Sequence, residues 1–120
     1  MTEVVICGYA RSAFTPAKKG QLNKTRPDDL AAEVIKGLLE KTGVKKEDVE
    51  DLILGCAFPE AEQGMNLARN VVFLTGLPKS VGGVTVNRFC ASSMQAIHQA
   101  AGAIHSGAGE IGRASCRERV

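Results

Sequence analysis

The chain has 120 residues, of which 44% are hydrophobic and 23% charged, a composition typical of one globular domain or part of one. Its formal charge of +2 is weak, so we expect neither a nucleic-acid nor a membrane partner. We also expect no signal peptide, and no run of roughly 18 apolar residues occurs. Its four cysteines form no CxxC pair and show no metal-ligand spacing with the two histidines, so we predict no metal site and no disulfide framework. The default prediction is a cytoplasmic protein.

The first third of the chain predicts a strand, a loop and a helix. Residues 4–9 form a short apolar run rich in branched side chains, as in a strand that is covered on both faces. Residues 11–26 lack periodicity and predict a long loop. Residues 27–42 predict a helix, because a proline and two acidic residues suit its first turn and Gly43 suits its end.

The same alternation continues through the rest of the chain. We predict a short polar connection over 44–49, a second buried strand over 51–57, a loop over 59–64, a helix over 65–75, a third strand over 81–87 and a third helix over 90–106. The order βαβαβα, with crossovers long enough for parallel pairing, predicts an α/β fold in which helices cover a mostly parallel sheet.

The last ten residues break this pattern. Residues 111–120 lose the apolar periodicity and contain three arginines. Together with Glu110 they resemble the translation of a widely used sequencing-adapter oligonucleotide, so we predict a partial domain over 1–110 and a non-native tail over 111–120. A natural basic tail is the alternative. Without the tail's three arginines and one glutamate the formal charge falls from +2 to 0, so the basic balance belongs to the tail.

Cys90 is the candidate catalytic residue. It follows the third predicted strand and opens an alanine-rich helix, where unpaired backbone N–H groups favour a thiolate. Ligands of open α/β sheets also bind beyond the carboxyl ends of strands. From spacing alone, a nucleophile and an inert core cysteine both stay possible for Cys90. We interpret Cys7 and Cys56, which lie inside apolar runs, as core residues.

No partner for Cys90 is evident within its own helix. His98 lies eight residues further on, which corresponds to about 12 Å along a helix, and His105 lies further still. We therefore expect both histidines at a solvated surface or a partner interface. The remaining polar and glycine candidates have ordinary structural interpretations. Ser92 and Ser93 suit local backbone bonding, Gly82 and Gly83 lack phosphate-loop spacing, and Asn66 and Arg69 face either the Cys90 site or solvent.

Residues 84–97, Val-Thr-Val-Asn-Arg-Phe-Cys-Ala-Ser-Ser-Met-Gln-Ala-Ile, resemble the nucleophile motif of thiolases. They are most similar to the degradative 3-ketoacyl-CoA type, in which Asn-Arg precedes the cysteine and Ser-Ser-x-Gln-Ala follows it. Asn87 and Arg88 argue against the ketosynthase branch. The resemblance extends over residues 3–110, through the segments Ala10-Arg11, Asp29-Leu30-Ala31, Ile53-Leu54-Gly55, Asn66-x-Ala68-Arg69 and Gly76-Leu77-Pro78.

The resemblance implies an acyltransferase of fatty-acid β-oxidation with part of the N-terminal half of a thiolase-like fold. Cys90 would attack the keto carbonyl of a 3-ketoacyl-CoA and hold the acyl group as a thioester, with its own backbone N–H in an oxyanion hole. Reaction with CoA then yields acyl-CoA and acetyl-CoA, and the reverse is a Claisen condensation. CoA and acyl-CoA are substrates, no cofactor is bound, and the parent protein is expected to be a homo-oligomer.

The chain lacks other parts of the family pattern. The Gly-His-Pro, Cys-x-Gly and Asn-Glu-Ala-Phe motifs, which supply the acid/base and water-holding groups of thiolases, do not occur in it. A non-catalytic truncated fragment is therefore the alternative function. The family's five-stranded sheet has the order 3-2-1-4-5, so we expect residues 4–9 to form an exposed apolar edge strand. That edge predicts a chain that is aggregation-prone or only partly folded by itself.

Overall fold

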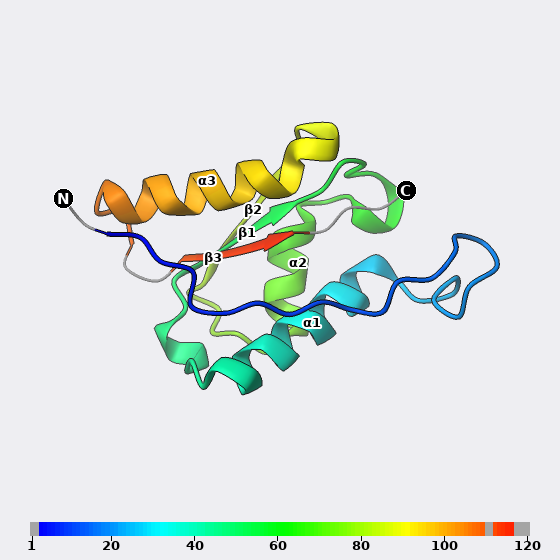
Figure 1. The fold of residues 1–120 in the computed structure, drawn as a ribbon, viewed down its shortest axis with the longest axis horizontal. Helices are drawn as coiled ribbons and strands as arrows, with labels where there is room; N and C mark the ends of the chain where they lie inside the picture. Colours follow the sequence, from blue (N-terminus) through cyan, green and yellow to red (C-terminus); the bar gives the residue numbers. More distant parts are fainter. Residues whose placement is uncertain (1–2, 110–111, 117–120) are drawn as a thin grey trace.

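The computed structural model describes residues 3–109 and 112–116, which form an α/β structure with helices on both faces of a small sheet (Figure 1). The elements are α1 (Pro27–Thr42), β1 (Asp51–Gly55), α2 (Leu67–Leu74), β2 (Gly82–Val86), α3 (Ser92–His105) and β3 (Gly112–Cys116), with 3-10 turns η1 (Lys46–Asp48), η2 (Ala61–Gln63) and η3 (Phe89–Ala91). The predicted α/β class is confirmed.

β1 lies at the centre of the sheet and pairs in parallel with both neighbours, in the order β2-β1-β3. Its pairing with β2 runs from Asp51 opposite Gly82 to Gly55 opposite Val86. α3 covers one face of the sheet, where Ile53 packs with Ala96 and Ala100. The other face packs against α2, with α1 outside α2, in the larger of the two hydrophobic clusters. The parallel β1–α2–β2 crossover is therefore as the sequence predicts.

α1 begins and ends at the predicted signals. Pro27 occupies its first turn, where a missing N–H costs nothing, and two acidic residues follow it. Gly43 ends the helix in the left-handed region at φ 72°, and its N–H bonds to the Leu39 carbonyl. The structure thus follows local capping chemistry here.

The predicted first strand is wrong. Residues 4–9 are extended but form no strand, and Val5 and Ile6 are 70% and 81% exposed. The segment runs beside the end of α1, where the Lys41 ammonium group donates to the Tyr9 carbonyl at 3.2 Å and lies 4.3 Å from the centre of its ring. The edge of β1 that was expected to pair with residues 4–9 is occupied by β3.

Occupation of that edge explains the difference, because one edge of a strand pairs with one neighbour. Residues 4–9 are therefore not the exposed edge strand that the sequence predicted. β3 lies within residues 111–120, and the non-native origin of these residues stays a prediction. Aggregation or partial folding of the isolated chain also stays a prediction.

Deletion of residues 111–120 tests the role of β3. It leaves the backbone of β1 unpaired along one edge, so we expect a lower urea midpoint and a larger mass in solution. Urea denaturation and light scattering after gel filtration measure the two effects. An unchanged midpoint together with a monomeric mass would show that β3 does not protect this edge.

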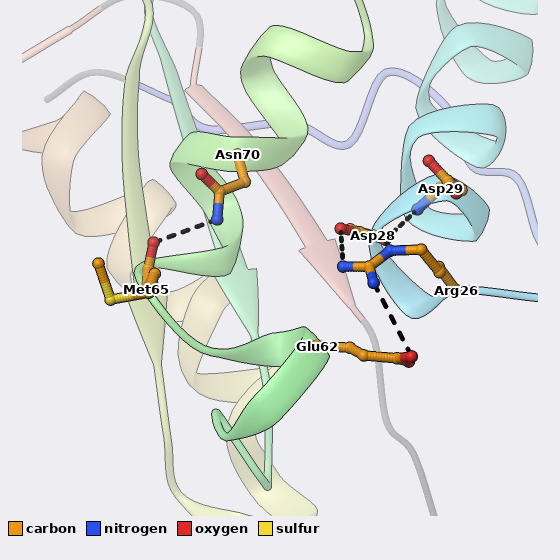
Figure 2. A network of polar contacts seen from close by, with 6 residues as sticks. All are labelled: Arg26, Asp28, Asp29, Glu62, Met65 and Asn70. Carbon is orange, nitrogen blue, oxygen red and sulfur yellow. Dashed lines mark hydrogen bonds and ion pairs between the residues drawn. The ribbon is translucent and has the colours of Figure 1, made fainter.

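A charged network attaches the start of α1 to η2 (Figure 2). The Arg26 guanidinium donates to both carboxylate oxygens of Asp28, at 3.1 and 3.0 Å, and lies 3.8 Å from a carboxylate oxygen of Glu62. The Asp29 N–H donates to Asp28 at 2.9 Å. Hydrogen bonding from Arg26 lowers the pKa of the Asp28 carboxyl, and the Asp29 N–H acts in the same direction.

Figure 2 also shows a separate hydrogen bond near the start of α2, in which the Asn70 side chain donates to the Met65 carbonyl.

The lowered pKa predicts acid-sensitive stability. A carboxyl with a depressed folded-state pKa stabilises the fold above its unfolded value near 4, and this contribution is lost as the pH falls through the folded-state pKa. Asp28→Asn should therefore lower the free energy of unfolding at pH 7 by less than about 1 kcal/mol, because the Arg26 partner is half exposed to solvent, and by a smaller amount as the pH approaches 3. Glu33→Gln is the control, because its ion pair with Lys36 is exposed. Equal effects of Asp28→Asn at both pH values, by urea denaturation, would contradict this account.

Candidate active site

The candidate site lies in the turn between β2 and α3, beyond the carboxyl end of β2. Cys90 is exposed there, within η3. The chain that leaves β1 reaches the same edge, where the rings of Phe58 and Phe89 are 6.4 Å apart and more than half exposed. Parallel pairing of β1 and β2 therefore brings an exposed thiol and two aromatic rings to one edge of the sheet.

The structure corrects the exact place of Cys90. The α-helix begins at Ser92, so Cys90 lies in the preceding 3-10 turn and does not open the helix itself. Phe89 has φ 45°, in the left-handed region that an aromatic side chain rarely adopts. This left-handed residue lies between the end of β2 and the start of α3, immediately before Cys90.

The side chains of Asn87 and Ser92 hold the turn. The Asn87 side-chain oxygen accepts from the Phe89 N–H at 2.9 Å. The Ser92 hydroxyl accepts from the Arg88 N–H at 2.8 Å and donates to the Phe89 carbonyl at 2.6 Å. The local backbone role expected for Ser92 is confirmed. The role of Asn87 was missed, although an asparagine two residues before a turn amide is a recognised signal.

Gly55 allows α3 to begin directly against β1. A Cβ atom at Gly55 would lie 2.6 Å from the Ser92 carbonyl carbon and 2.6 Å from the Ser93 nitrogen. Both are backbone atoms, so they cannot move aside as a flexible side chain can. The absence of a side chain at Gly55 thus fixes how closely the first turn of α3, and with it the Cys90 turn, approaches the sheet.

The other described cysteines differ from each other. Cys56 is 2% exposed and its N–H bonds to the Val86 carbonyl at 2.9 Å, so its predicted core position is confirmed. Cys7 is exposed, and the core prediction for it is wrong because residues 4–9 lie outside the sheet. The side chain of the fourth cysteine lies outside the described residues.

The two histidines lie on α3 beyond the Cys90 turn. Both His98, in the middle of the helix, and His105, its last residue, are exposed, as the surface interpretation predicted. α3 runs without interruption from Ser92, so His98 lies about 9 Å along the helix from its first residue and His105 lies further still.

Asn66 and Arg69 bind the backbone of the β2 region. Asn66 donates to the Gly83 carbonyl at 2.9 Å and accepts from the Thr85 hydroxyl at 2.8 Å. Arg69 donates to the carbonyls of Val81 and Lys79. These bonds resolve the open question from the sequence, because they give both side chains a structural role between α2 and β2.

Gly82 and Gly83 lie within β2, where the sequence already disfavoured a phosphate loop. A Cβ atom at Gly83 would lie 2.7 Å from the Arg69 backbone, so this glycine permits close packing of α2 against β2. Close packing of the two elements therefore explains why a glycine is needed at position 83.

A cavity of about 370 Å³ lies at the other end of the sheet, where β1 and β2 begin. It is lined in part by Glu50, Asp51, Ser80 and Ile104.

The described residues contain no group of three or more His, Cys, Asp or Glu side chains that could hold a metal ion. Within the same residues, no helix combines the length and apolar character needed to cross a membrane.

Comparison with known proteins identifies the family. The family model described as the thiolase N-terminal domain matches residues 4–119. The chain belongs to the thiolase family. Its relatives include 3-ketoacyl-CoA thiolases of Bacillus subtilis (strain 168), 50% identical over 108 residues, and of Colwellia psychrerythraea (strain 34H), 46% identical over 112 residues. These matches cover 90% and 92% of this chain but only 28% and 29% of the relatives, so the chain spans less than a third of their length.

The packing at Gly55 predicts a specific cost for a methyl group. Gly55→Ala should lower the free energy of unfolding by about 1–3 kcal/mol, because the new Cβ atom meets the α3 backbone. Gly37→Ala is the matched control, since no atom lies within 4 Å of its Cβ position in α1 and it should stabilise the helix by roughly 0.5–1 kcal/mol. Urea denaturation compares the two, and equal effects would argue against close packing at Gly55.

Proposed function

We propose that the parent protein is a 3-ketoacyl-CoA thiolase in which Cys90 accepts the acyl group. The observation that supports this most directly is an exposed thiol in a hydrogen-bonded turn at the carboxyl edge of a parallel sheet, in a chain of the thiolase family. The relatives named 3-ketoacyl-CoA thiolase support the substrate class.

In the proposed reaction, the Cys90 sulfur attacks the C3 carbonyl of a 3-ketoacyl-CoA and forms a tetrahedral oxyanion. Collapse breaks the C2–C3 bond, leaves the acyl group on Cys90 as a thioester, and releases acetyl-CoA after its enolate takes up the proton lost by the thiol. The thiol of a second CoA then attacks the thioester, its proton returns to Cys90, and acyl-CoA leaves. The backbone N–H of Cys90 would donate to the oxyanion. The reverse sequence is the condensation.

The proposal assigns catalytic turnover to the parent protein but not to this 120-residue chain. Thiolases move these protons with groups in the Gly-His-Pro and Cys-x-Gly motifs, which this sequence does not contain. We propose that the 120-residue chain keeps the nucleophile but does not turn over. A homo-oligomeric parent, a cytoplasmic location and a role in fatty-acid β-oxidation belong to the same proposal.

Substitution of the nucleophile in the parent protein tests the function. Cys90→Ser should lower thiolysis of acetoacetyl-CoA by at least about 10³-fold, because the acyl thioester can no longer form. The assay follows the CoA-dependent loss of acetoacetyl-CoA absorbance, and mass spectrometry locates the acyl adduct. Cys7→Ser is the control, since Cys7 is exposed but lies outside the sheet. Retained thiolysis in Cys90→Ser would refute the assignment.

The same assay on the 120-residue chain separates the two functional hypotheses. We expect no CoA-dependent turnover, because the family's proton-transfer motifs are missing from it. Sustained thiolysis by the purified chain that disappears in Cys90→Ser would exclude the non-catalytic alternative.

A further inference from the structure

The Ser92 hydroxyl lies where it can control the peptide bond on the amino side of Cys90. Ser92 is 2% exposed, and its hydroxyl bonds to two backbone groups of the turn, accepting from the Arg88 N–H and donating to the Phe89 carbonyl. The second bond, at 2.6 Å, lies within the ordinary range for a hydroxyl donor. The Asn87 side-chain oxygen is a second acceptor at 3.5 Å, so the Phe89 carbonyl is the closer of two acceptors for the single hydroxyl proton.

The bond to the Phe89 carbonyl also determines where the Cys90 N–H points. The carbonyl of Phe89 and the N–H of Cys90 belong to the same planar trans peptide unit, so they point in opposite directions. The Ser92 backbone N–H donates to the same carbonyl, so the hydroxyl and the 3-10 turn hold this peptide together, with the Cys90 N–H pointing away from Ser92. Rotation of this peptide about the line that joins the Phe89 and Cys90 Cα atoms would reorient the carbonyl and the N–H together.

Asn87 restrains the other side of Phe89. Its side-chain oxygen accepts from the Phe89 N–H at 2.9 Å, so both peptide groups of Phe89 are bonded to side chains. Phe89 is held at φ 45°, a conformation that is unfavourable for this residue without such support. The two side chains thus stabilise the strained residue immediately before the candidate nucleophile.

We propose that Ser92 is a positioning residue, supported by Asn87, that orients the Cys90 N–H as an oxyanion donor. This inference rests on the proposed function, because an oxyanion forms only if Cys90 accepts an acyl group. Ser92 itself contacts no reacting atom and acts through the Phe89–Cys90 peptide. Its hydroxyl should therefore affect reactions that form a tetrahedral oxyanion more than reactions of the same thiol that form none.

Two reagents separate these reactions on the 120-residue chain. Acetylation by p-nitrophenyl acetate passes through an oxyanion, whereas alkylation by iodoacetamide is a direct displacement at carbon. Peptide mapping by mass spectrometry gives both rates at Cys90, at exposed Cys7 as an internal reference, and at buried Cys56 as a reporter of unfolding. We expect the ratio of acetylation to alkylation in the unsubstituted chain to be higher at Cys90 than at Cys7.

Ser92→Ala should lower acetylation of Cys90 by about tenfold and alkylation by less than about threefold, since a misplaced donor affects only the oxyanion. Asn87→Ala should lower the acetylation-to-alkylation ratio at Cys90 in the same direction. If Ser92→Ala makes Cys56 reactive, that variant has unfolded. The Asn87→Ala variant then tests the inference, because Asn87 is exposed and its loss should leave the core intact. Ser106→Ala is the matched control, because its hydroxyl donates to the Ala103 carbonyl at the opposite end of α3.

The outcomes distinguish the inference from the function on which it rests. An unchanged ratio in the folded Ser92→Ala variant, with a raised ratio at Cys90 in the unsubstituted chain, overturns the positioning role alone. A ratio at Cys90 no higher than at Cys7 in the unsubstituted chain overturns the oxyanion role of the Cys90 N–H and with it the positioning role of Ser92, whereas Cys90→Ser in the parent protein decides the proposed function. A selective loss in Ser92→Ala and Asn87→Ala, with Ser106→Ala unchanged, supports both roles.

Discussion

The close approach between β1 and the first turn of α3 is the constraint on which the candidate site depends. The position of a Cβ atom at Gly55 is already taken by the backbone of Ser92 and Ser93. Because the helix begins this close to the strand, the side chain of Ser92 is enclosed beneath the turn that carries Cys90. A larger residue at Gly55 would separate the strand from the helix and remove the support of the turn.

The Cys90 turn combines local strain with local support. A residue such as Phe89 at positive φ costs about 1–2 kcal/mol. The bonds from Asn87 and Ser92 to the flanking backbone are each worth about 1 kcal/mol, so together they offset this cost. The result is a thiol that is exposed to reagents while the backbone beneath it is held in one conformation.

The sheet explains why this turn lies at an edge rather than in the core. β1 is covered by α2 on one face and α3 on the other, and its parallel pairing with β2 sends both strand ends to the same side. Phe58 and Phe89 meet there, and both are more than half exposed. An apolar, accessible surface beside the thiol is compatible with the acyl substrates of the proposed function.

The comparison of sequence and structure separates local from non-local information. The α1 boundaries, the buried run of β1 and the identity of Cys90 as the candidate nucleophile follow from the sequence, because caps, apolar runs and a family motif are written in consecutive residues. The local bonding of Ser92 was also predictable, since hydroxyls in a helix first turn usually bind nearby backbone.

Other features depend on the tertiary structure. Residues 4–9 have the composition of a buried strand, but a sheet edge accepts one neighbour and β3 occupies it, so the segment lies outside the sheet and Cys7 is exposed. The packing role of Gly55, the backbone bonds of Asn66 and Arg69, and the geometry of the Cys90 turn also depend on contacts between distant or differently folded segments. The sequence by itself therefore determined the family and indicated Cys90 as the candidate nucleophile, because both depend on a contiguous motif. Only the tertiary structure decided which strand pairs with β1 and how Cys90 is held, because edge pairing and close packing arise when the chain folds.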